Sequence, residues 1–135
     1  MLSPWQPAAT ADNVAGVSAG LLLVDDEREF LALARELLGR EARIVGEART
    51  GDEAFSMLLT SNPEIAIVDV QLGRESGFEL ARRLLDQAPG LRVVMVSADD
   101  HPGYQKLSRS VGAAGFLPKK RLSLGAIESV LAEPV

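Results

Sequence analysis

Five short apolar runs alternate along the chain with stretches of helical period, and this alternation limits the fold more than any other feature. Each run is four to six residues long, which is the usual length of a strand. Several are apolar at consecutive positions, as expected for strands buried on both faces of a parallel sheet. The runs occupy residues 21–24, 43–46, 65–68, 91–96 and 114–117.

The stretches between these runs place apolar side chains three and four residues apart, which is the spacing of one helical face. The first predicted face combines Phe30, Leu33, Ala34, Leu37 and Leu38. The later faces are formed by Phe78, Ala81, Leu84, Leu85 and Ala88, by Tyr104, Leu107 and Val111, and by Ile127, Val130 and Leu131.

Thr50 with Glu53, and Ser76 with Glu79, have the spacing of a capping box, in which each side chain accepts an amide hydrogen bond where a helix starts. Together these signals predict an α/β fold of five βα units with right-handed crossovers. We expect a doubly wound, flavodoxin-like (βα)5 domain whose five parallel strands have the order 2-1-3-4-5.

Composition excludes several classes of function. The chain has 14 basic and 19 acidic residues, and its net charge of −5 argues against direct nucleic-acid binding. It has no cysteine and one histidine, His101, which excludes disulfides, Cys/His zinc sites and Ser–His–Asp catalysis of the usual sort. No apolar run is long enough to span a membrane, and no basic residue precedes Arg28 as in a secretory signal. We therefore expect a cytoplasmic protein, with a flexible extension over residues 1–20 and one domain over residues 21–135.

Polar side chains follow four of the predicted strands. Asp25 and Asp26 follow the first, Asp69 the third, Ser97 the fourth and Lys119 the fifth. Ligands of such folds bind beyond the carboxyl ends of the strands, so these side chains are expected to converge. Taken singly each has an ordinary explanation: a helix cap for Asp26, turn residues for Asp69 and Ser97, and a solvated side chain for Lys119.

The three carboxylates are harder to explain as a group. Two like charges ~4 Å apart repel by ~4 kcal/mol at an effective dielectric of 20. A divalent cation removes this cost, and an all-oxygen, partly open site suits Mg²⁺. Such a site also suits a carboxylate that attacks phosphorus, with the metal, a lysine and a hydroxyl stabilising the phosphoryl oxygens.

The residues around these positions resemble the receiver domain of two-component response regulators. Gly77 also lies eight residues after Asp69, as in that family. The resemblance covers residues 21–132 and is carried by four motifs in order: LLLVDDE, VDVQL, MVSA and GAAGFLPK.

The resemblance implies that Asp69 is the phosphorylated aspartate. It implies that Mg²⁺ binds the carboxylates of Asp26 and Asp69, the backbone carbonyl of Gln71 and, through water, Asp25. Lys119 would pair with the phosphoryl group.

Further roles also come from the resemblance. Ser97 would donate a hydrogen bond to a phosphoryl oxygen, and Phe116 would be the aromatic that changes rotamer in response, unless it is simply a buried strand residue. Gln71, Ala98 and Asp99 occupy positions that would tune hydrolysis of the acyl phosphate.

The implied function is a signalling switch rather than an ordinary enzyme, with self-phosphorylation and autodephosphorylation as its only reactions. It would receive phosphate from a sensor histidine kinase or a phosphotransfer protein. Phosphorylation would then alter the surface made by the fourth helix, fifth strand and fifth helix, which would bind a downstream protein or form a homodimer. About 14 residues follow the expected last helix start at Leu122, so the chain is either a stand-alone receiver or part of a longer transcriptional regulator.

The sequence is also compatible with two other functions. One is a receiver-like interaction module that works without phosphorylation. The other is a phosphatase or phosphotransferase of a related fold, for which we expect Asp-x-Asp at the nucleophile, whereas this chain has Asp69-Val70-Gln71.

The chain departs from the family pattern at two places. Gly73 stands where the family often has proline, which predicts a less rigid loop over residues 72–76. Lys120 follows Lys119 where the family often has a cis proline. Because the two lysines are adjacent, the alignment with the family's lysine could slip by one residue, although the spacing from Phe116 favours Lys119. The isomer of the Leu117–Pro118 peptide bond stays open. His101 is interpreted as a loop residue rather than a relay histidine.

Overall fold

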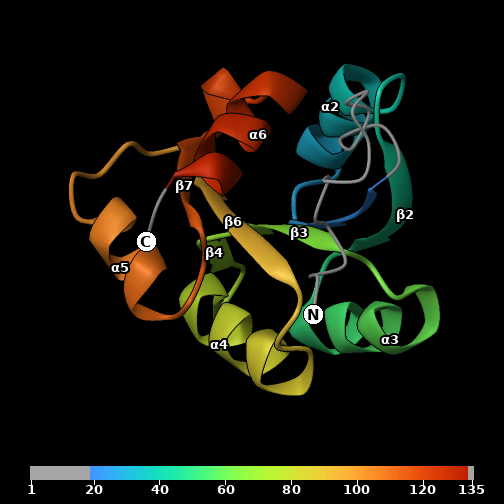
Figure 1. The fold of residues 1–135 in the computed structure, drawn as a ribbon, viewed down its shortest axis with the longest axis horizontal. Helices are drawn as coiled ribbons and strands as arrows, with labels where there is room; N and C mark the ends of the chain where they lie inside the picture. The colour runs from blue at the N-terminus through green and yellow to red at the C-terminus, as the bar shows by residue number, and fades with distance from the viewer. Residues whose placement is uncertain (1–18, 134–135) are drawn as a thin grey trace.

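The computed structural model describes residues 19–133, and the predicted extension, Trp5 included, lies almost entirely outside them. Five parallel strands form one sheet in the order β2-β1-β3-β6-β7 (Figure 1), which confirms the predicted order 2-1-3-4-5. The strands are β1 (Gly20–Val24), β2 (Arg43–Ala48), β3 (Ile65–Asp69), β6 (Arg92–Ser97) and β7 (Gly115–Pro118).

Helices cover both faces of this sheet. In Figure 1, α2 and α6 lie on one face and α3, α4 and α5 on the other. A short 3-10 turn, η2 (Lys119–Arg121), links β7 to α6. The helices are α2 (Arg28–Leu38), α3 (Gly51–Ser61), α4 (Gly77–Gln87), α5 (Tyr104–Ser110) and α6 (Leu124–Ala132).

The two cores follow from the alternation of side chains along the strands. Leu21, Leu23 and Ile67 pack beneath α2 and α6, whereas Leu22 and Val24 pack beneath α3 and α4. Because β1 and β3 are covered on both sides, both sets of their alternating side chains are buried, whereas the edge strand β2 is buried only at Ala48. Each fully buried leucine contributes about 1.5–3 kcal/mol relative to exposure.

The predicted face of the first helix is partly wrong. Leu33 and Leu37 are 49% and 47% exposed, whereas Leu31, which the pattern left out, is buried. The apolar run Phe-Leu-Ala-Leu-Ala at residues 30–34 allows either of two neighbouring helical faces to be apolar. The face that packs on the sheet contains Leu31, Ala34 and Leu38.

Side-chain caps account for most helix starts. Thr50 and Ser76 accept hydrogen bonds from the amides of Glu53 and Glu79, at 3.1 and 3.2 Å. Glu27, not Asp26, is the N-cap residue of α2 and its side chain makes no capping bond.

The last helix starts two residues later than the expected Leu122. Ser123 caps α6 by accepting a hydrogen bond from the amide of Ala126 at 3.0 Å, and the helix begins at Leu124. Leu122 is instead buried after the 3-10 turn.

A small antiparallel hairpin that the sequence did not predict follows β3. It pairs β4 (Gln71–Leu72) with β5 (Glu75–Ser76) across the turn Gly73-Arg74. Gly73 has φ +60°, a conformation that proline cannot adopt. A proline at this position would therefore require a different turn.

All peptide bonds between the described residues are trans, Leu117–Pro118 included. No helix within residues 19–133 is both long and apolar enough to cross a membrane.

Candidate functional site

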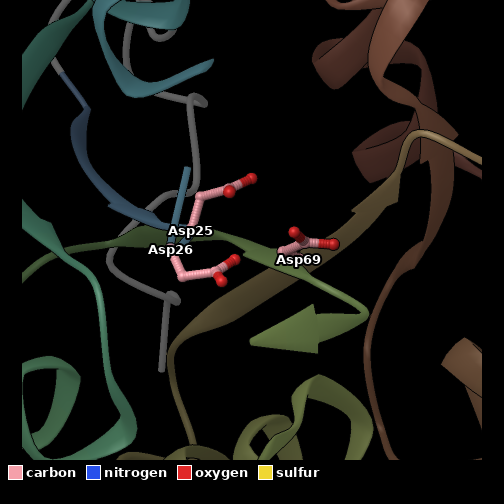
Figure 2. Close-up of side chains that lie close together, drawn as sticks. All are labelled: Asp25, Asp26 and Asp69. Carbon is pink, nitrogen blue, oxygen red and sulfur yellow. The ribbon is translucent and has the colours of Figure 1, made fainter. Parts of the chain in front are cut away.

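Three aspartates meet at the carboxyl ends of two neighbouring strands. β1 and β3 pair in parallel with Val24 opposite Val68, so the next residues, Asp25 and Asp69, emerge side by side. One carboxylate oxygen of each of Asp25, Asp26 and Asp69 lies within 4.8 Å of those of the other two. Figure 2 shows the three side chains projecting into one region beyond the strand ends.

Burial sets the electrostatics of this cluster. Asp25 is 1% exposed and Asp69 6% exposed, while Asp26 is half-buried. Burial, followed by the charge of Asp25, raises the pKa of Asp69 to about 6 from its ordinary 3.8, against the opposing effects of the Gln71 amide and Lys119. The cluster therefore favours a bound cation or a proton.

Lys119 supplies the positive charge of the site. Its Nζ lies 2.7 Å from Asp25 Oδ2 and 3.2 Å from Asp69 Oδ2. Burial alone lowers the pKa of Lys119, but hydrogen bonds to Asp25 and Glu27 and the charges of Asp69 and Asp25 outweigh it and hold that pKa above its ordinary value. Lys120 is exposed, so the structure brings the first of the two lysines into the cluster.

Glu27 is a fourth carboxylate that the sequence reasoning missed. Its Oε1 lies 2.8 Å from Lys119 Nζ, closer than the carboxylate of Asp69. Its backbone amide donates to Asp25 Oδ1 at 2.9 Å. The sequence signal that could have identified Glu27 was its place as the third acid of Asp-Asp-Glu at residues 25–27, directly before a helix.

Ser97 ends β6 beside these acids and is buried. Its Oγ accepts a hydrogen bond from the Asp99 amide at 3.0 Å, which leaves the hydroxyl proton available to another acceptor. Ala98 and Asp99 are exposed at the rim. An open pocket of about 350 Å³ is lined by Asp26, Glu27, Asp69, Gln71, Gly73, Ser97, Ala98 and Asp99.

The segment after Asp69 forms the opposite wall. The Gln71 amide donates to Asp69 Oδ1 at 3.2 Å, and Gln71 Nε2 donates to the Gly73 carbonyl at 2.6 Å. Gly77 is required for close packing, since a Cβ there would lie 1.7 Å from the Asp69 carbonyl oxygen. The eight-residue spacing between Asp69 and Gly77 thus has a steric reason.

Phe116 lies on β7, outside the carboxylate cluster, and is half-buried. Its ring centroid is 5.3 Å from that of Tyr104 in an edge-on contact, and Tyr104 also contacts Phe78 and His101. The aromatic side chain therefore contacts Tyr104 of α5 and does not lie at the acids.

The donor set fits a hard divalent cation. Its ligands are carboxylate oxygens with excess negative charge, open to solvent on one side, which is the environment that Mg²⁺ and Ca²⁺ prefer.

Comparison with known proteins identifies the family of this chain. The family model for the response regulator receiver domain matches residues 21–130. The transcriptional activator protein ExaE of Pseudomonas putida is 36% identical over 113 residues, which cover 82% of this chain and 53% of that protein. The uncharacterized transcriptional regulatory protein YvfU of Bacillus subtilis is 29% identical over 101 residues, covering 73% of this chain and 50% of that protein. The chain thus spans about half the length of these curated relatives.

Solved structures show the same fold. A LuxR-family response regulator from Aurantimonas superimposes with a TM-score of 0.77 at 25% identity, covering 85% of this chain and 86% of that one. A response regulator protein from Burkholderia pseudomallei, solved with a phosphorylated aspartic acid, a calcium ion and citrate, has a TM-score of 0.75 at 26% identity, covering 84% of this chain and 66% of that one. From its strand order, its acidic cluster and the family match over residues 21–130, this chain belongs to the response regulator receiver domain family of two-component signal transduction.

Proposed function

We propose that this receiver accepts a phosphoryl group on Asp69 from a cytoplasmic sensor histidine kinase or phosphotransfer protein, in a Mg²⁺-dependent reaction. The observation that carries the proposal is the meeting of Asp69 with two further aspartates and Lys119 at the wall of an open pocket. The receiver domain would start slightly before the expected residue 21, because Gly20 belongs to β1 and Ala19 to the core, with the preceding residues as an extension.

The chain's own residues would hold the metal and the phosphoryl group. Asp26 and Asp69 would bind Mg²⁺ through carboxylates, Gln71 through its carbonyl and Asp25 through water. When bound, the metal supplies positive charge that neutralises the nucleophile and the phosphoryl oxygens.

The transfer itself needs no general base, because Asp69 is already deprotonated above its pKa of about 6. A carboxylate oxygen of Asp69 forms the new O–P bond while the P–N bond of the donor phosphohistidine breaks, and the imidazole leaves with the bonding electrons. Lys119, released from its carboxylate partners, pairs with the phosphoryl group. Water later hydrolyses the acyl phosphate, at a rate that Gln71, Ala98 and Asp99 would tune.

The switch would start at Ser97. Its free hydroxyl proton would be donated to a phosphoryl oxygen, which draws the loop after β6 inward and changes the space available to Phe116. The responding surface is that of α5, β7 and α6, where Leu107 is 47% exposed. We propose that this surface binds a downstream protein or a second copy of the chain, and that any DNA contact belongs to a separate output domain.

The test is intact-mass spectrometry after incubation with Mg²⁺ and acetyl phosphate. A gain of about 80 Da in the native chain, lost in Asp69→Asn and in excess EDTA, is the expected result. Asp86→Asn, which changes an exposed aspartate on α4, is the matched control and should be labelled like the native chain. A folded protein that binds Mg²⁺ but accepts phosphate from neither acetyl phosphate nor any histidine kinase would instead indicate a phosphorylation-independent interaction module.

A further inference from the structure

The hairpin after the proposed phosphoacceptor is tied to a distant helix by one side chain. The amide of Gly51 donates to both carboxylate oxygens of Glu75, at 3.0 Å to Oε1 and 3.3 Å to Oε2. Gly51 is the first residue of α3 and lies 24 positions before Glu75. The contact places a carboxylate at the positive end of a helix, where both the free amides and the helix dipole favour it.

The local sequence leaves room for this contact. A Cβ at position 51 would lie 2.4 Å from Glu75 Oε1, so only glycine allows the carboxylate to approach the amide this closely. Thr50 caps a different amide of the same helix, that of Glu53. Glu75 therefore accepts a hydrogen bond from the Gly51 amide, which the cap residue Thr50 does not bind.

The hairpin is held at few points. Its two strands have two residue pairs, and both residues of β5 are exposed. A ribbon this short is not stable by itself. Leu72 holds β4 through burial in the core, and β5 continues into α4, whose first amide, that of Gly77, donates to the Val70 carbonyl at 2.7 Å. The carboxylate of Glu75 adds the link from β5 to α3.

The same hairpin forms a wall of the acidic pocket. Gln71 and Gly73 line that pocket, and a Cβ at Gly73 would lie 3.7 Å from Asp26 Oδ2. The amide of Gln71 also holds Asp69 Oδ1. Any displacement of the hairpin therefore moves groups that face the aspartates.

We propose that Glu75 is a positioning residue for the metal and phosphoryl site, and that its bond to Gly51 couples that site to α3. The proposal rests on the proposed function, since it assigns Glu75 a role in Mg²⁺ binding at Asp26, Asp69 and the Gln71 carbonyl. Coupling is reciprocal, so occupation of the site must in turn strengthen the bond to Gly51. The junction between β2 and α3 thereby becomes a second region, besides the surface of α5, β7 and α6, whose structure changes when the site is occupied.

The experiment is an NMR titration of the full chain with MgCl₂, reporting the Mg²⁺ Kd and the amide exchange rate of Gly51. Removal of one hydrogen bond to the hairpin in Glu75→Ala is expected to raise Kd about 3- to 10-fold. Glu75→Gln keeps an oxygen acceptor for the amide and is expected to stay within about 2-fold of the native Kd. Glu128→Ala removes the same charge from an exposed position on α6, away from the hairpin, and serves as the matched control.

Gly51→Ala tests the contact from the other side. Alanine has the higher helix propensity, which offsets part of the stability that α3 loses when the new Cβ displaces the Glu75 carboxylate. This variant is expected to raise the Mg²⁺ Kd as Glu75→Ala does, which a purely structural role for Glu75 would not produce. In the native chain, Mg²⁺ is expected to slow exchange of the Gly51 amide, and this effect should vanish in Glu75→Ala.

A native Mg²⁺ Kd in both Glu75→Ala and Gly51→Ala, with exchange at Gly51 unaffected by Mg²⁺, would overturn the inference while leaving the proposed function intact. A native chain that neither binds Mg²⁺ nor becomes phosphorylated on Asp69 would overturn the proposed function itself, and Glu75 would lose its role with it.

Discussion

Asp69→Asn is expected to stabilise the metal-free protein, although it removes the proposed phosphoacceptor. The pKa of Asp69 is raised to about 6 in the folded chain, so folding disfavours its charged form. An asparagine of nearly the same shape keeps an oxygen for the Gln71 amide and carries no charge beside Asp25. The variant therefore retains the Gln71 hydrogen bond and loses both the repulsion from Asp25 and the ion pair with Lys119. Because burial and Asp25 outweigh Lys119 in their effect on the pKa of Asp69, the net change is expected to be stabilising.

The magnitude follows from the difference between the folded pKa of about 6 and the ordinary value of 3.8. Each pH unit corresponds to about 1.36 kcal/mol, so the upper limit is about 3 kcal/mol. Because the carboxylate faces an open pocket, solvent screening reduces this to about 1–2 kcal/mol. For a domain of this size, the gain corresponds to a rise in Tm of roughly 4–8 °C.

The sign of the pH dependence is set by the raised pKa. Below about pH 4 the carboxyl is protonated in both the folded and unfolded chains, so Asp69 and asparagine should be equivalent there. As pH rises from 4 to 6, the unfolded chain releases its proton first, and the native protein loses stability relative to the variant. Above pH 6 both states of the native chain are ionised and the difference stays constant.

Urea unfolding in EDTA at pH 4, 5, 6 and 7.5 measures this difference directly. Asp86→Asn, at an exposed position on α4, controls for loss of one negative charge. Saturating Mg²⁺ should reverse the order of stability, since the native chain gains binding free energy that the variant lacks. Equal stability of the native chain and the Asp69→Asn variant at pH 7.5 in EDTA, or a gap that widens toward pH 4, would refute the electrostatic reasoning.

Three further outcomes are expected. Gly77→Ala should lower the free energy of unfolding measured in urea by about 2 kcal/mol or more, because its Cβ would lie 1.7 Å from the Asp69 carbonyl oxygen. Gly125→Ala should not, because the atom nearest to its Cβ, Ser123 Oγ, is 4.0 Å away. Equal effects of the two changes would contradict the steric argument. Lys119→Gln should tighten Mg²⁺ binding measured by calorimetry, because it removes a cation that competes for the same carboxylates, and it should slow labelling by acetyl phosphate. Lys120→Gln should change neither quantity. If Lys120→Gln is the defective variant instead, Lys120 is the lysine of the site. Asp26→Asn should weaken Mg²⁺ binding about 10-fold or more in the same assay, and an unchanged affinity would remove Asp26 from the ligand set.

Local signals were sufficient for the strands and for the starts of α3 and α4. Each of the five apolar runs corresponds to a strand of the sheet, and four of these strands are mostly buried because helices cover both faces, whereas the edge strand β2 is only partly buried. The meeting of Asp25 and Asp69 also follows from the sequence, because residues that end adjacent parallel strands must emerge together. Thr50 and Ser76 cap the helices that their spacing predicts, since capping depends on residues three positions apart.

Other features depend on contacts between residues far apart in the chain. Which stripe of α2 is buried, Leu31 rather than Leu33, is decided by how that helix docks on the sheet, and the 3.6-residue period allows either. The hairpin after Asp69 is too short to give a periodic signal, and the positive φ of Gly73 appears only once the turn closes.

The partners of Glu27 and Glu75 show the same division. In the sequence both look like ordinary exposed surface residues. In the structure, however, Glu27 contacts Lys119, 92 positions away, and Glu75 contacts Gly51, 24 positions away. A linear sequence specifies which groups are charged and where each strand ends, because those properties are local. Which ammonium or amide each carboxylate meets is decided only when the sheet order and the helix packing bring distant segments to the same place.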